Sequence, residues 1–242
     1  MKSSIITVFV VLISMFSLSA QESWINYEFD VPPEKAEAFV GALNTFFNTK
    51  TGKSLPIAYL TEQTLGNQEV THHVSFISDD VDLMGKLLDP SNWESEDWMK
   101  LGMAMTELGT LPIRSFSGMP VVASEPKPEA NNGFQVIYAM RVGFNEQMNI
   151  LQSFQSSVSA MQPLLDDLNI EISLHQHIAG DDRDVTHWAI ESHQNYASFL
   201  RAQQRMMQSA EMGKMFDAMG RANAQNPMTI ARTILIAWNT PK

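Results

Sequence analysis

The sequence predicts an α+β protein built from two consecutive copies of one βαββαβ unit, and three observations support this. The tripeptide Val-Thr-His occurs at residues 70–72 and again at 185–187, each time in a strand-like run. The segment 123–133, ASEPKPEANNG, has two prolines, an Asn-Asn-Gly and no apolar periodicity, which predicts a linker. The same order of elements is predicted on both sides of it, as in an internal repeat.

Each copy opens on a strand followed by a helix. Apolar residues alternate along residues 24–31 and 135–142, which is typical of a strand with one buried face. Apolar residues then recur at helical spacing in 34–47 and 145–161. Because strand side chains alternate between faces, we expect one set to point away from these helices: Asn26, Glu28 and Asp30 in the first copy, and Ile137, Ala139 and Arg141 in the second.

A hairpin comes next in each copy. In the first copy, residues 54–60 lead through the turn sequence LGNQ into the strand that contains the first Val-Thr-His. In the second, residues 169–177 lead through AGDD into the strand that contains the other. The same alternation directs a further set away from the helices: Ala58, Leu60 and Glu62, and in the second copy Ser173, His175 and His177.

Each copy ends with a Met-rich helical region and a strand. The helical regions are 91–105, where Ser91 and Glu94 form a capping-box pattern, and 196–220. The methionines of these regions are interpreted as core filler rather than metal ligands. The closing strands are 111–118 and 228–238, in which Arg114 aligns with Arg232.

This element order, found twice, is that of the ferredoxin-like unit, whose sheet has helices on one face only. Together with the acidic, Trp-bearing segment SNWESEDW at 91–98, it resembles the dimeric α/β-barrel superfamily. That group contains antibiotic-biosynthesis-type monooxygenases, stress-responsive A/B barrel proteins and NIPSNAP-like proteins. The resemblance implies two ferredoxin-like repeats, 21–122 and 134–242, packed as a pseudo-dimeric barrel. It also implies that ligands sit between sheet and helices or inside the barrel.

The first twenty residues have the pattern of an export signal. Lys2 precedes an apolar run from Ile5 to Phe16, and small residues lead to a cleavage region before Gln21. We therefore expect the mature protein in the periplasm or outside the cell, with no membrane attachment after cleavage. The chain has no cysteine, which excludes disulfides, thiolate metal sites and a cysteine nucleophile.

The charge balance argues against nucleic acid as a partner. The chain has 16 basic and 27 acidic residues, and its Lys and Arg are scattered rather than clustered. Binding to phosphate backbones requires clustered positive charge. We expect a small-molecule ligand as the partner, no cofactor, and a monomer, because the pseudo-dimer lies within one chain.

His72 and His187 occupy equivalent positions in the two copies. A neutral imidazole can act as a base, so these two are candidate catalytic residues. The alternative is that each packs against a neighbouring element beside its threonine, since a repeat first preserves packing. Arg114 and Arg232 are candidate anion-binding partners or, alternatively, members of sheet-edge ion pairs.

The histidine spacing does not predict a metal site. His175 and His177 share a strand face, and the partner strand brings His187 back across the turn. A tight turn at Asp181-Asp182 pairs His177 with Thr186 and directs His187 to the opposite face, so convergence requires a longer loop or a bulge.

The strand residues that point away from the helices are more polar than a sealed core requires, which indicates a lined cavity. We expect an exported protein that binds a small, partly apolar ligand there. The alternatives are an oxygenase-like or isomerase-like enzyme that needs no cofactor and uses a strand histidine as base, and a protein-interaction module of the cell envelope. The expected ligand-binding residues are Asn26, Glu28, Arg141, His175 and His177.

Overall fold

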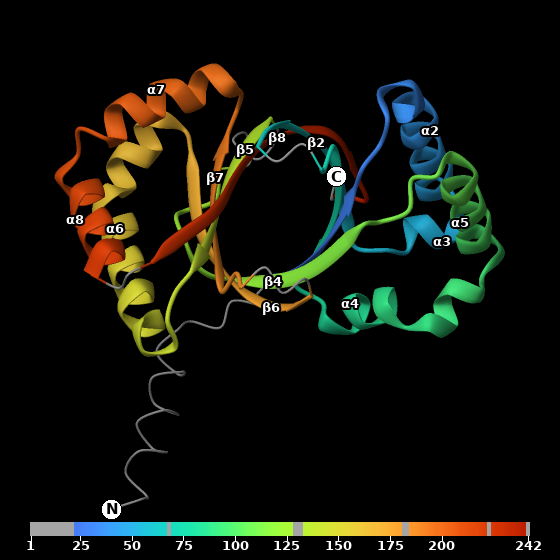
Figure 1. Cartoon of the computed structure of the whole chain (residues 1–242), viewed down its shortest axis with the longest axis horizontal. Coiled ribbons are helices and arrows are strands. Elements are labelled where there is room, and N and C mark those ends of the chain that lie inside the picture. The colour runs from blue at the N-terminus through green and yellow to red at the C-terminus, as the bar shows by residue number, and fades with distance from the viewer. Residues whose placement is uncertain (1–21, 67–68, 128–132, 181–183, 222–223, 241–242) are drawn as a thin grey trace, which may run out of the picture.

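Eight strands form one closed antiparallel barrel in the computed structural model, which describes residues 22–66, 69–127, 133–180, 184–221 and 224–240 (Figure 1). Around the barrel the strands follow the order β1-β3-β2-β8-β5-β7-β6-β4. The strands are β1 (Ser23–Phe29), β2 (Ile57–Leu65), β3 (His72–Ser78), β4 (Arg114–Ala123), β5 (Phe134–Arg141), β6 (Glu171–Gly180), β7 (His187–His193) and β8 (Gln225–Trp238).

The two halves of the chain contribute equally to the barrel. The first half supplies the run β4-β1-β3-β2, and the second supplies β8-β5-β7-β6, which is the same order. Two antiparallel pairings between halves close the ring, β2 with β8 and β4 with β6. Each sheet edge of one half is therefore paired with an edge of the other.

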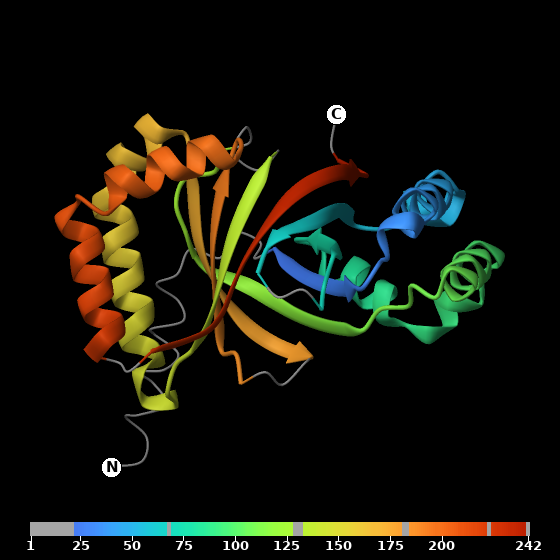
Figure 2. The same cartoon turned by 45° about the horizontal axis from the view of Figure 1, so that its top comes forward.

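The helices cover the outside of the barrel in two groups on opposite sides (Figures 1 and 2). Helices of the first half pack against β1, β2, β3 and the end of β8, and those of the second half pack against β5, β6, β7 and the later part of β4. The α-helices among the described residues are α2 (Ala36–Phe47), α3 (Lys50–Lys53), α4 (Val81–Leu88), α5 (Glu96–Leu108), α6 (Gln147–Leu168), α7 (Tyr196–Met206) and α8 (Ala210–Arg221).

An apolar core fills the layer between each helix group and its sheet. The first core joins Phe29 of β1 to Phe39 and Leu43 of α2, and the second joins Leu174 of β6 to Phe154 of α6. Burial of these side chains supplies the main drive for folding, at about 25 cal/mol per Å² of apolar surface. The methionines of the later helices, such as Met105 and Met206, are buried in the same two cores.

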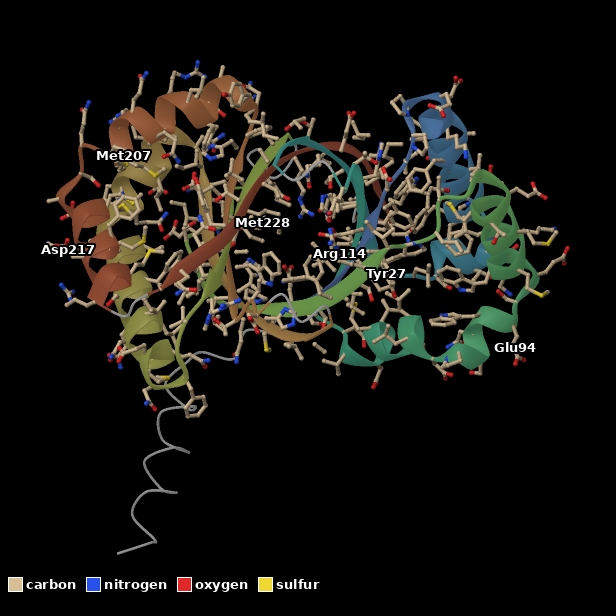
Figure 3. The ribbon with its side chains drawn as sticks, in the orientation of Figure 1. Tyr27, Glu94, Arg114, Met207, Asp217 and Met228 are labelled. Atoms are coloured by element: carbon tan, nitrogen blue, oxygen red, sulfur yellow. The ribbon has the colours of Figure 1, made fainter. Side chains whose placement is uncertain are left out.

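The predicted faces of the first strand are confirmed. Tyr27 and Phe29 pack with the helices, whereas Asn26 points into the barrel (Figure 3 labels Tyr27). For the second strand the prediction was wrong, because Ala58 and Leu60 lie in the helix-facing core. In the pairing Ala58 lies opposite Phe76 and Leu60 opposite Val74, so the repeat alignment was displaced by one residue, and a one-residue shift reverses every face.

The predicted alignment of Arg114 with Arg232 was also wrong. Arg114 is paired with Glu28 of β1, and the corresponding pair in the second half is Met228 with Ala139, so Met228 is the counterpart of Arg114 (Figure 3). Arg232 lies opposite Gln135, a position that the first half gives to Gly118 opposite Trp24. The two arginines are therefore unrelated by the repeat.

Local capping was predicted in part. The Asp80 carboxylate caps α4 by accepting hydrogen bonds from the backbone N–H groups of Asp82 and Leu83 in its first turn. The capping box at Ser91 was wrong: 90–94 form a 3₁₀ helix, and Ser95 caps α5. The expected export signal, 1–20, lies outside the described residues, as do residues 128–132 of the expected linker. None of the described helices has the length and apolar character needed to cross a membrane.

Gly118 of β4 allows a close approach that a larger residue would prevent. A Cβ atom there would lie 2.4 Å from the Trp24 ring and 2.7 Å from the carbonyl oxygen of Gln176. We expect Gly118→Ala to lower the free energy of unfolding by about 1–3 kcal/mol through overpacking, measured by urea denaturation. Gly102→Ala on the exposed side of α5, where a Cβ would meet nothing within 4 Å, is the control and should not destabilise. Equal losses in the two variants would contradict this account.

Candidate ligand site: the barrel cavity

The barrel encloses a cavity of about 230 Å³. It is called the barrel cavity below. Space of this size holds about eight waters and lies just below the range typical of drug-sized ligands. The cavity reaches the surface beside Glu22, which is exposed, and Glu171, which is half-buried.

One wall of the barrel cavity is apolar and aromatic. Phe116 of β4 stacks on Trp188 of β7 with ring centroids 4.8 Å apart, and Trp24 of β1 meets Phe116 edge-on at 5.8 Å. Isoleucines from β2, β3, β5, β7 and β8 also line the cavity, namely Ile57, Ile77, Ile137, Ile190, Ile230 and Ile234. Flat, apolar groups would pack well against such a surface.

Another part of the lining is a hydrogen-bonded network around Arg232 of β8. The Arg232 Nε donates to Oε1 of Gln135 at 2.8 Å, and Nη1 contacts Oδ1 of Asn26 and Oγ of Ser75, both at 3.4 Å. Ser75 Oγ also donates to Asn26 Oδ1 at 2.7 Å. These contacts hold the guanidinium group against the barrel wall in one orientation.

Arg232 is the charged centre of the cavity. Burial lowers its pKa to about 10, although the negative charge of Glu28 raises it, so the side chain stays cationic at neutral pH. Nη2 hydrogen-bonds to no described residue, and this nitrogen remains accessible. The Nη2 amino group of this buried guanidinium can therefore donate hydrogen bonds to a ligand.

His175 of β6 lines the same cavity as a neutral imidazole. Trp24 Nε1, which can only donate, bonds to its Nδ1 at 2.9 Å, so the proton is on Nε2, which donates to Ser173 Oγ at 2.7 Å. Burial and the positive charge of Arg232 lower the pKa of His175 to about 3. Both ring nitrogens are occupied, and the imidazole is a poor base at neutral pH.

A chain of polar contacts continues from the cavity toward the start of β4. Asn26 Nδ2 contacts His73 Nδ1 at 3.3 Å, and His73 lies 3.8 Å from Glu28 Oε1. Glu28 is almost fully buried and accepts from Arg114 Nε at 2.8 Å. Glu28 therefore points into the barrel, as expected, but lies beyond the cavity lining, and Arg114 is its ion-pair partner rather than a cavity residue.

His72 and His187 lie on the helix-facing side of the sheet, outside the cavity. His72 packs against Phe39 of α2 with ring centroids 5.5 Å apart. Each histidine bonds through Nδ1 to the threonine before it, at 2.9 Å in both halves. Burial lowers the pKa of both imidazoles.

The threonines explain why Val-Thr-His is repeated. Thr71 Oγ1 accepts from the backbone N–H of Val31 at 2.8 Å, and Thr186 Oγ1 accepts from that of Val142 at 3.0 Å. In each half the hydroxyl thus binds the backbone just beyond the end of the neighbouring strand, where the ladder has stopped. The two halves therefore share this packing contact.

The remaining expected site residues are divided between the cavity and its surroundings. Asn26 and His175 line the cavity, and His177 lies beyond it, beside Trp188. Arg141 is at the end of β5, paired with Asp184. Gln176 lies opposite His187 in the β6–β7 ladder, so His187 is on the other face from His175 and His177, and the three imidazoles do not converge. No cluster suited to a metal occurs among the described residues.

Several cavity residues were missed by the sequence reasoning. Ser75, Phe116, Gln135 and Trp188 all line the cavity, yet none belongs to a recognisable motif. The available signal was alternation along β3 and β7: once His72 and His187 face the helices, the residues after them face the barrel. His73 and its counterpart in the second half, Trp188, both line the cavity.

No family model and no curated protein matches the sequence. Solved structures do match. One is a candidate monooxygenase from Fusobacterium nucleatum, with a TM-score of 0.61 and 11% identity over 92% of this chain and 96% of that chain. Another is an anthrone oxidase-like protein, with a TM-score of 0.62 and 9% identity over 93% of this chain and 96% of that chain. A candidate monooxygenase from Lactobacillus acidophilus matches with a TM-score of 0.59 at 4% identity over 90% and 96% of the chains.

The chain has the fold of the dimeric α/β-barrel superfamily. At these identities the likeness establishes the fold alone. The residues that line the barrel cavity must therefore be interpreted from their own chemistry.

The neutral state of His175 makes stability depend on pH. The unfolded chain protonates this imidazole below its ordinary pKa of about 6.5, whereas the folded chain does not until about pH 3. The contribution of His175 to the free energy of unfolding is therefore at its maximum at neutral pH and falls as the pH drops below about 6.5. At about pH 5 it is about 2 kcal/mol lower than at neutral pH. Urea denaturation at about pH 7.5 and about pH 5 should show that the free energy of unfolding falls less between the two pH values in His175→Gln than in the wild type. Equal losses would contradict the prediction.

Proposed function

We propose that the protein binds a small, partly apolar molecule inside the barrel cavity. The observation that carries the proposal is that one cavity is lined both by an aromatic cluster and by a network built around a buried arginine. Ligand pockets commonly combine an apolar lining with a few oriented polar groups. The layers between sheet and helices, by contrast, are occupied by the two apolar cores.

A buried polar atom beside the cavity supports the same proposal. Trp188 is 4% exposed, and its indole Nε1 is buried without a hydrogen-bond partner among the described residues. Leaving such a donor unsatisfied costs about 1–3 kcal/mol. A ligand that brings an acceptor atom into the cavity could offset part of this cost.

The binding proposal predicts that filling the cavity abolishes binding. Native mass spectrometry of the purified protein should show a co-purifying small molecule that denaturing conditions release. Ile234→Trp, which adds volume at a cavity-lining position of β8, should lose it. Leu235→Trp is the matched control, because the adjacent Leu235 is 42% exposed and does not line the cavity. A wild-type protein that never carries or takes up a small molecule would rule the proposal out.

A second candidate function is an oxygenase-like enzyme that acts on an anionic substrate. Arg232 could stabilise negative charge that develops on a substrate oxygen, and two structural neighbours are named as candidate monooxygenases. His175, with its depressed pKa, is poorly suited to remove a proton, so this function requires a substrate that arrives as the anion. Oxygen uptake with such a substrate, lost in Ile234→Trp and retained in Leu235→Trp, would support it.

We further propose that the barrel is a fused pair of ferredoxin-like units. The identical strand order in the two halves and the repeated threonine contacts support this. In this proposal, the pairings of β2 with β8 and of β4 with β6 correspond to the interface between the two units of a dimer. This arrangement is consistent with a chain that works as a monomer.

Export by the N-terminal segment is also proposed, on the charge and apolar pattern of residues 1–20. Expressed with its full N-terminus in a bacterial host, the protein should be recovered outside the cytoplasm with a mass that corresponds to cleavage before Gln21. Lys2→Glu combined with Val10→Asp, which places a charge in the apolar run, should leave it uncleaved. An intact N-terminus on the wild-type protein outside the cytoplasm would exclude cleavage.

A further inference from the structure

We propose that the barrel cavity selects a monoanionic aromatic molecule, such as an aryl carboxylate or phenolate, whose charged oxygen binds Nη2 of Arg232. This inference rests on the proposed ligand-binding function and names the class of ligand. The evidence is the state of Arg232, the shape of the aromatic wall and the distribution of acidic groups around the cavity.

The guanidinium group carries a charge that no carboxylate in contact with it neutralises. All contacts of Arg232 with described residues are to the neutral oxygens of Gln135, Asn26 and Ser75. The nearest ionic influence, Glu28, forms its own ion pair with Arg114. Burial of a cation is costly unless an opposite charge compensates it, so an anion in the cavity would restore the balance.

The position of Arg232 within its network also defines where the anion binds. Nε and Nη1 of Arg232 already donate hydrogen bonds to residues of the barrel, so Nη2 is the donor that a ligand can reach. His175, neutral and bonded at both ring nitrogens, adds no second charge. Among the described residues that line the cavity, Arg232 is the one basic side chain other than the histidines.

The acidic lining residues restrict the ligand to a single negative charge. Glu22 and Glu171 lie in the part of the cavity that reaches the surface, and after burial their negative charges are the further causes that raise the pKa of Tyr59. A second anionic group on the ligand would meet these carboxylates. A monoanion avoids them by placing its charged end at Arg232 and its ring against Trp188 and Phe116.

The aromatic wall and the volume limit the rest of the molecule. Stacked Phe116 and Trp188 present planar surface, and the isoleucines are apolar. A cavity of about 230 Å³ accepts one or two fused rings and excludes larger ring systems. Benzoate and 2-naphthoate are therefore suitable probes.

The test is a charge series on one ring system, measured by isothermal titration calorimetry with the complete mature chain. The probes are 2-naphthoate, neutral 2-naphthamide, cationic 2-naphthylmethylammonium and the dianion naphthalene-2,6-dicarboxylate. We expect 2-naphthoate to bind about 10- to 100-fold more tightly than the amide, the range of a charge-assisted hydrogen bond. The cation and the dianion should bind more weakly than the amide or not at all.

Arg232→Gln should remove the preference, so that carboxylate and amide bind within about threefold of each other. Arg205→Gln is the matched control, because Arg205 is paired with Asp167 on the exposed side of α7 and lies outside the cavity. Arg205→Gln should keep the wild-type ratio of the affinities for 2-naphthoate and 2-naphthamide. The wild-type series stands by itself if Arg232→Gln fails to fold.

Three results would overturn the inference. If the wild-type protein binds amide and carboxylate equally, the cavity binds ligands but does not select anions, and the proposed function survives alone. If Arg232→Gln folds and keeps the preference, another group holds the anion. If none of the probes, benzoate included, binds wild-type protein and blocking the cavity changes nothing, both the inference and the proposed function fail.

Discussion

The pairing of sheet edges between the two halves is the constraint on which the rest of the structure depends. A half with strand order β4-β1-β3-β2 leaves β4 and β2 with unpaired backbone groups, and exposed edges invite uncontrolled association. Here β2 pairs with β8 and β4 with β6, so the ring has no edge. Closure also removes the inner face of each sheet from bulk solvent. The inner positions thereby become the lining of a cavity.

The candidate site depends on a difference between the two halves inside the cavity. Where the first half places Gly118 opposite Trp24, the second places Arg232 opposite Gln135. In the first half the Trp24 indole packs directly against the backbone of Gly118. In the second half the buried Arg232 guanidinium joins a hydrogen-bonded network with Gln135. Contacts then cross between halves: Trp24 binds His175, and Arg232 binds Asn26. Neither half contains the site by itself.

The outer layers contrast with this interior. His72, His187 and their threonines kept the same contacts in both halves because those contacts hold strand ends beside the helices. Residues that are the same in the two halves therefore lie at packing contacts, and residues that differ line the candidate site. The barrel cavity follows this rule, since His73 in one half is replaced by Trp188 in the other.

The sequence by itself determined the α+β class, the order of elements in each half and the side of β1 that faces the helices. These follow from local periodicity, which needs no knowledge of the partner strand. It also identified Asn26, His175 and Arg232 as candidates. Only the tertiary structure decided the faces of β2, the true counterparts of Arg114 and Arg232, and the convergence of Ser75, Gln135, Trp188 and Phe116 on one cavity. The reason is physical: strand register and barrel closure arise from pairing between segments distant in the chain, and a shift of one residue reverses which side chains face inward.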